Sequence, residues 1–268
     1  MHGFFVYPQL FEFVVLPFLD VKEHHKLAVI CKDVLKIIGV PSRILTTFHP
    51  RPGGWNKGIC FSCAVHPQSL AKFVQYAAGV KEICFQCEHM PHFCSRKLDL
   101  SPLSFLSTLQ NLTVLNCSGV QPLILPHLKT LDLRFLNLDV DLAEHHGVAT
   151  DTLILNFCNL KNLKRFNAPL RKLDLCGCTQ LRHFDAHQPS LQELGLSFCT
   201  TLSTLDGVLR CTHLISLDLS YCCSVRDIFL LGNLTHLQDL NLSHCCNIDI
   251  KRKMKALILC HPKNIFFV

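Results

Sequence analysis

The sequence contains no apolar run of the roughly 18–20 residues that a membrane-spanning helix needs, so we expect no membrane span. Its first residues lack a basic region followed by an apolar core, and we expect no signal peptide. It also lacks a phosphate-binding glycine loop, a Gly-x-Ser-x-Gly turn, a His-Glu-x-x-His pair and a dinucleotide fingerprint. These absences argue against an enzyme, and we predict a non-catalytic protein without a cofactor.

Charged residues are also scarce, at 17% of the chain against 49% hydrophobic residues. That balance supplies a folded core and excludes a mainly disordered protein. The net charge of +6 is modest for so large a surface and favours neither nucleic acid nor membrane partners. Cysteine is abundant, with 17 copies. An odd number of cysteines at apolar repeat positions indicates reduced, packed thiols, which predicts a cytoplasmic or nuclear location.

Leucine recurs in one fixed phrase, Leu-x-x-Leu-x-Leu-x-x-Cys. The Leu-x-Leu pairs of five copies begin at Leu153, Leu173, Leu194, Leu217 and Leu240, with gaps of 20, 21, 23 and 23 residues. A period of this length is typical of a repeat array. Leu-x-Leu alternates with period two, so both leucines point to one face of a short strand. Such a strand buries its apolar face only when parallel neighbours stack on it.

The phrase resembles the cysteine-containing subclass of leucine-rich repeats. That resemblance implies an α/β solenoid, in which parallel strands line the concave face of a horseshoe and helices or turns form its back. We assign residues 58–268 to this repeat domain and residues 43–57, which are rich in Pro and Gly, to a connector.

Weaker copies extend the array in both directions. Strands are expected at Ile59 and Ile83 with a helix over residues 67–78 between them, at Leu115-x-Cys117, at Leu131-x-Leu133 and at Ile265. The two middle copies leave gaps of 32 and 16 residues, which we interpret as an insertion and a shortened repeat. Residues 249–260 are expected to form an amphipathic helix before the last strand.

Four cysteines in two Cys-x-x-Cys pairs have the spacing of a zinc site: Cys60, Cys63, Cys84 and Cys87. The same cysteines also follow the repeat frame, which places Cys60 and Cys84 at equivalent positions on adjacent strands. Repeat inheritance explains the spacing without a metal, and we favour it over a zinc site.

Residues 1–42 depart from the repeats and predict a helical segment. Phe11, Val14, Val15 and Phe18 form one helical stripe, and Asp20 can cap a second helix. The order Pro8, Phe11, Val15, Phe18-Leu19-Asp20, Leu27, Val29-Ile-Cys-Lys32 resembles an F-box. Leu10, His24 and Val34 depart from that pattern.

The F-box resemblance implies docking on a Skp-type adaptor in a cullin complex. The expected contact residues are Pro8, Phe11, Val15, Phe18, Leu19 and Val29. Together the two resemblances imply the substrate-recognition subunit of an SCF-type ubiquitin ligase. The alternative is a free-standing repeat scaffold whose first helices only cap the open end of the stack.

The residues that flank each Leu-x-Leu are expected on the concave face, where a target protein would bind. The charged members are Asp132, Arg134, Lys172, Asp174, Glu193, Asp218 and Asp239. Because acids outnumber bases, the pattern favours a basic segment of the target. The alternative is that Ser, Asp and Asn at these positions are simply well-solvated strand residues.

Overall fold

The computed structural model describes residues 58–62, 70–71, 74, 80–86, 98–117, 128–136, 150–163, 169–185, 188–249 and 263–266. Within these ranges no helix is both long and apolar enough to cross a membrane. The predicted F-box-like segment, the connector up to residue 57 and all but the first residue of the helix predicted over residues 249–260 lie outside them.

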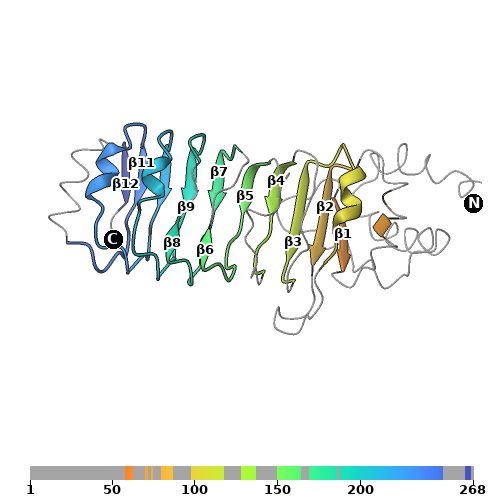
Figure 1. Cartoon of the computed structure of the whole chain (residues 1–268), viewed down its shortest axis with the longest axis horizontal. Helices are drawn as coiled ribbons and strands as arrows, with labels where there is room; N and C mark the ends of the chain where they lie inside the picture. Colours follow the sequence, from red (N-terminus) through yellow and green to blue (C-terminus); the bar gives the residue numbers. More distant parts are fainter. Residues whose placement is uncertain are drawn as a thin grey trace, which may run out of the picture.

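Ten short strands form one all-parallel sheet. They are β1 (Gly58–Ser62), β2 (Glu82–Gln86), β3 (Asn111–Leu115), β4 (Leu128–Asp132), β5 (Thr150–Ile154), β7 (Lys172–Asp174), β9 (Glu193–Gly195), β10 (Ser216–Asp218), β11 (Asp239–Asn241) and β12 (Asn264–Phe266). Their spatial order follows the sequence from β1 to β12. The strands therefore lie side by side in one row, as a solenoid of stacked repeats requires (Figure 1).

The strand register confirms the repeat frame. Leu153, Leu173, Leu194, Leu217 and Leu240 are successive register partners, and Ile265 of β12 pairs with Leu240. We call the residue at this register position the anchor of its repeat. The five leucine anchors and the leucines two residues later are buried in one continuous core, and Ile265 packs against it partly buried. Burying this shared apolar face is what holds the stack together.

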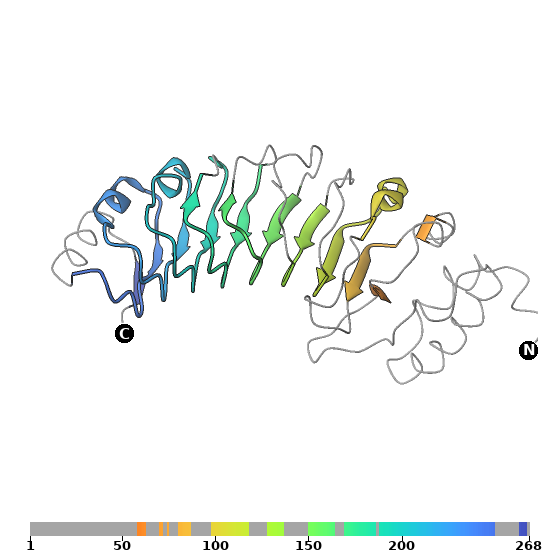
Figure 2. The same cartoon turned by 60° about the horizontal axis from the view of Figure 1, so that its bottom comes forward.

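Turns and short 3-10 helices return the chain from one strand to the next. The 3-10 helices are η5 (Ser101–Phe105), η7 (Val208–Arg210) and η8 (Phe229–Asn233). A second, two-stranded sheet pairs β6 (Asn162–Leu163) with β8 (His183–Phe184). Repeats of 20–23 residues leave little room for longer helices. In Figure 2 the row of strands is curved and the 3-10 helices lie on its outer side, so the described repeats form an arc with a concave strand face.

One predicted strand was placed three residues too late. The anchor of β3 is Leu112, which pairs with Ile83 on one side and with Leu131 on the other. The prediction began that strand at Leu115. Leu115-x-Cys117 imitates the Leu-x-Leu phrase, but Cys117 holds the cysteine position, five residues after its anchor. The gaps around this strand are therefore 29 and 19 residues, with no strongly shortened repeat.

Candidate binding face

The concave face carries the side chains that alternate with the buried anchors. Lys172 and Glu193, each one residue before its anchor, are register partners on β7 and β9. Their side chains form an ion pair at 2.7 Å between Nζ and Oε2, and both are about half exposed. The structure thus places both residues where the sequence predicted them, and their role in binding stays a prediction.

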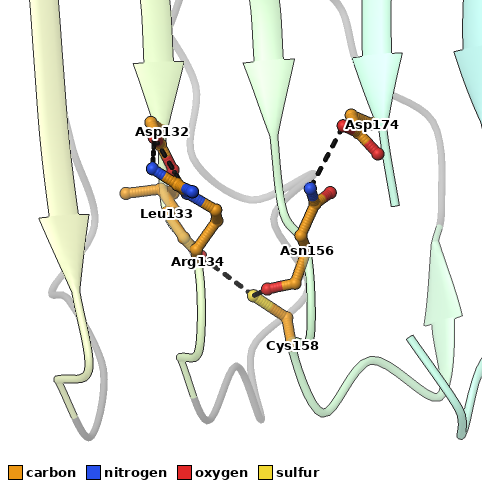
Figure 3. A network of polar contacts seen from close by, with 6 residues as sticks. All are labelled: Asp132, Leu133, Arg134, Asn156, Cys158 and Asp174. Carbon is orange, nitrogen blue, oxygen red and sulfur yellow. Dashed lines mark hydrogen bonds and ion pairs between the residues drawn. The ribbon is translucent and has the colours of Figure 1, made fainter. Parts of the chain in front are cut away.

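Asp132, which the sequence analysis places among the target-binding residues of the concave face, has a buried carboxylate. Its residue is only 6% exposed. The Arg134 guanidinium donates to both carboxylate oxygens, from Nε at 2.9 and 3.0 Å, and the two groups form an ion pair (Figure 3). A buried carboxylate needs such a partner because burial removes its water. This pair is therefore part of the fold, and only its half-buried arginine side is available to a partner.

Two of the predicted acids cap the ends of their own strands. Asp174 Oδ1 accepts a hydrogen bond from the Cys176 backbone N–H at 3.1 Å, and Asp218 Oδ1 accepts from the Ser220 N–H at 2.9 Å. Asn241 makes the same contact with Ser243 N–H at 3.1 Å. This local pattern explains why Asp or Asn stands there. Because Asn serves equally in the last case, the turn itself does not require the negative charge.

Asp174, Asp218 and Asp239 nevertheless leave the face acidic. Their side-chain partners among the described residues are neutral: Asn156 Nδ2 donates to Asp174 Oδ2 at 3.1 Å (Figure 3), and Asn264 Nδ2 donates to Asp239 Oδ1 at 2.7 Å. In contrast, the two bases Arg134 and Lys172 already pair with acids. Within the described part of the face, negative charge is therefore in excess.

A feature that the sequence prediction missed lies where each strand ends. The fourth residue after every anchor from Leu112 to Leu240, which we call the turn position, has a positive φ. These residues are Asn116, Phe135, Phe157, Gly177, Phe198, Tyr221 and His244, with φ between 57° and 74°. From Phe135 to Tyr221 their N–H groups donate to the next repeat, as Phe157 does to the Cys176 carbonyl at 2.8 Å. Hydrogen bonds to the next repeat thus hold these residues in the left-handed conformation.

Five of the seven turn positions hold a ring, and these rings form what we call the ring column: Phe135, Phe157, Phe198, Tyr221 and His244. Phe135 stacks on Phe157 with centroids 5.0 Å apart, and Tyr221 lies between Phe198 at 4.1 Å and His244 at 4.3 Å. The phenylalanines and Tyr221 are 36–52% exposed. The sequence feature that could have predicted the ring column is an aromatic residue directly before the repeat cysteine, as in Phe157-Cys158 and Phe198-Cys199.

An aromatic residue at the turn position carries a conformational cost. Left-handed backbone costs an L-residue about 1–2 kcal/mol, and Gly or Asn adopts it most readily. Asn116 and Gly177 are such residues, whereas the column keeps bulky rings in the same conformation. Strain of this kind is often retained at functional sites, although ring stacking also offsets part of it.

The repeat cysteines form a buried row beneath the turn positions. The thiols of Cys158, Cys178, Cys199, Cys222 and Cys245 each donate to the carbonyl oxygen of the leucine two residues after the preceding anchor, at 2.9–3.3 Å. Burial raises the pKa of Cys158 and Cys222 to about 12. These thiols stay protonated at neutral pH and serve packing, as the sequence predicted.

The four cysteines with zinc-like spacing are described only in part. Cys60 and Cys84 are register partners on β1 and β2, which is the relationship that repeat inheritance predicts. Cys84 is buried. Cys63 and Cys87 lie outside the described residues. Within the described ranges, no group of three or more His, Cys, Asp or Glu side chains is arranged to hold a metal.

Comparison with known proteins gives similarity to solved structures alone. No protein family matches the chain, and no curated protein does. Among solved structures, an internalin of Listeria monocytogenes is similar, at 15% sequence identity and a TM-score of 0.34, over 76% of this chain and 71% of that one. The strand order, the register and the buried leucine core themselves define the class, a parallel-strand solenoid whose repeats are anchored by leucines.

Proposed function

We propose that the protein is a protein-binding scaffold that uses its concave strand face to hold a target. The observation that supports this is the face itself, which carries polar side chains on the described strands from β2 to β11 with an excess of acids. Within the described part of the chain, no cation forms an ion pair with Asp174, Asp218 or Asp239. A broad, rigid and charged surface suits recognition of an extended, basic protein segment.

We further propose that residues 1–42 make this scaffold the substrate-recognition subunit of an SCF-type ubiquitin ligase. The support is the sequence pattern alone: Pro8, then Phe11 and Val15, then Phe18-Leu19, at the spacing of an F-box. In that arrangement the segment docks on a Skp-type adaptor within a cullin complex, and the repeats present the bound target. A scaffold with a helical cap and no ubiquitin role is the competing function.

A capture experiment with a purified Skp-type adaptor tests the ligase proposal. Wild type should retain the adaptor, and the double variant Pro8→Ala/Leu19→Asp should lose it while its circular dichroism spectrum and unfolding midpoint stay unchanged. A second double variant, Lys251→Ala/Lys253→Ala, changes charges at the far end of the chain and should retain the adaptor. Failure of folded wild type to bind would leave the scaffold function and remove the ligase one.

A further inference from the structure

The ring column is interrupted once, at Gly177. Phe157 stacks on Phe135, and Phe198 stacks on Tyr221, so each of the two stacks ends beside this glycine. A Cβ at Gly177 would meet the ring of Phe157, which shows that this ring leans over the glycine. The ring face of Phe198 that points toward Gly177 has no stacking partner among the described residues.

The interruption spans two repeats of backbone. Adjacent strands lie about 4.8 Å apart, so the backbones of Phe157 and Phe198 are separated by about 10 Å. The Phe157 ring takes up part of this separation, because a Cβ at Gly177 would lie 2.4 Å from its Cδ1. A planar group stacked between two rings needs about 7–8 Å between the ring planes.

Negative charge lies at the same repeat as the gap. Asp174 stands three residues before Gly177, and its carboxylate lies over Gly195, where an added Cβ would come within 2.8 Å of Oδ1. One neutral amide and one backbone N–H occupy two of its lone-pair positions, and a carboxylate has about four. Burial, then the charge of Asp174 and that of Asp218, raise the pKa of Cys176, so both carboxylates act on the residue next to Gly177.

Ring faces and carboxylates together select one kind of ligand. The face of an aromatic ring is negative and its edge is positive, so a cation binds to the face. Where two rings stack, each covers a face of its neighbour. At the gap, the Phe198 face toward Gly177 has no stacking partner among the described residues, and Asp174 belongs to the same repeat as Gly177. Guanidinium is planar, stacks on rings and pairs with a carboxylate, which a compact ammonium does less well.

We propose that the gap at Gly177 is a binding site for the guanidinium group of an arginine in an extended basic segment of the target protein. The arginine stacks between Phe157 and Phe198 and pairs with Asp174. This rests on the proposed scaffold function and adds a specific residue to it. The occupant is a protein segment because the acids of the concave face continue on either side of the gap, at Glu193 and Asp218, for neighbouring basic residues.

The test uses the full-length protein and three synthetic probes. The peptides acetyl-Gly-Ser-X-Ser-Gly-amide, with arginine, lysine or citrulline at X, are titrated while the backbone amide shifts of Cys176, Gly177 and Phe198 are followed by NMR. The arginine peptide should shift these amides saturably. The citrulline peptide, which has the same shape without the charge, should bind at least tenfold more weakly, and the lysine peptide at least threefold more weakly.

Two variants and one control locate the site. Gly177→Phe completes the ring column with the residue that neighbouring repeats carry, and should abolish the arginine response. Asp174→Asn keeps the strand-end contact, as Asn241 shows, and should weaken binding at least fivefold. Asp227→Asn is the matched control, because Asp227 makes the same kind of contact with the Phe229 N–H at 2.9 Å, away from the gap. It should leave binding unchanged.

The outcomes separate this site from the scaffold function. Equal binding of the arginine and citrulline peptides, or an arginine response that survives both Gly177→Phe and Asp174→Asn, overturns the arginine site. If a concave-face charge change still releases targets in that event, the scaffold function stands without the arginine site. If neither the peptide nor a target responds to changes on this face, the scaffold proposal fails as well.

Discussion

The thiol of Cys158 donates a hydrogen bond to the carbonyl oxygen of Leu133, one repeat earlier, across 2.9 Å (Figure 3). The same contact recurs from Cys178 to Leu155 at 3.1 Å and from Cys222 to Leu196 at 3.0 Å. The carbonyls of Leu155 and Leu196 also accept a backbone N–H within their own turns, from Cys158 at 3.3 Å and from Cys199 at 3.1 Å, so the thiol occupies a second lone pair. The cysteine row therefore joins successive repeats and has no need of reactivity.

The buried thiols should make stability fall at alkaline pH. In the unfolded chain these thiols ionise near their ordinary pKa of 9.0, whereas burial raises the pKa of Cys158 and Cys222 to about 12. Their contribution is fully present below pH 9 and is lost as the pH rises toward 12, because only the unfolded state releases the protons. In that window each thiol should lower the free energy of unfolding by roughly 1.4 kcal/mol per pH unit.

Urea unfolding at pH 8.0, 9.5 and 10.5 measures this slope. Cys158→Ala removes one of the thiols and should make the decline shallower, even though the variant is less stable at pH 8. The exposed Ser203 provides the control, because Ser203→Ala removes no thiol and should leave the slope unchanged. Equal slopes for wild type and Cys158→Ala would show that this thiol is not protected by the fold.

Tyr221 should reverse the usual order of alanine and glycine substitutions. At its φ of 60° an alanine is strained and a glycine is not, while both remove the ring that stacks on Phe198 and His244. We therefore expect Tyr221→Gly to be more stable than Tyr221→Ala by about 1 kcal/mol in urea unfolding. The ordinary order, with alanine the more stable, would mean that the turn backbone is not held in the left-handed region.

Two ion pairs on the concave face should differ sharply in their effect on stability. Arg134→Ala leaves the buried carboxylate of Asp132 without its partner, and should cost about 2–4 kcal/mol. Lys172→Ala breaks a pair whose groups are both about half exposed, and should cost less than about 1 kcal/mol. Thermal unfolding of the two variants gives the comparison. Similar costs would contradict the burial of Asp132.

The sequence predicts the solenoid well because leucine spacing reports the register directly. The anchors at Leu153, Leu173, Leu194, Leu217 and Leu240 are paired as predicted, since a one-residue shift would turn every leucine outward. The anchor of β3 was misplaced because Leu115 and Leu112 both fit an apolar pattern. The cysteine position, five residues after the anchor, distinguishes them: Cys117 follows Leu112 by that interval.

The candidate site was harder to predict. Alternation places Asp132 on the concave face, yet it does not show that Arg134 folds back to cover its carboxylate. The ring column was not predicted, because a hydrophobic pattern does not reveal the sign of φ. Phe157 or Tyr221 before a cysteine can equally be a core residue. Only the stacking of repeats brings these rings into one row, with Gly177 as its interruption.

Charge reversal on the two sides of the solenoid tests the central claim that the concave face binds the target. Lys172→Glu/Glu193→Lys exchanges the ends of an exposed ion pair on the concave face. Asp185→Arg/Arg210→Asp exchanges a comparable exposed pair between the end of β8 and η7, away from that face. Both variants keep the pair and the net charge, so both should fold like wild type.

The measurement is quantitative mass spectrometry of the proteins that wild type and the two exchanged variants retain from the same cell extract. If the concave face binds the target, Lys172→Glu/Glu193→Lys should retain a set of wild-type partners at least tenfold less well. Asp185→Arg/Arg210→Asp should retain the same partners as wild type does. Partners that are kept by the concave variant and lost from the outer one would place the binding surface on the back of the solenoid and contradict the central claim.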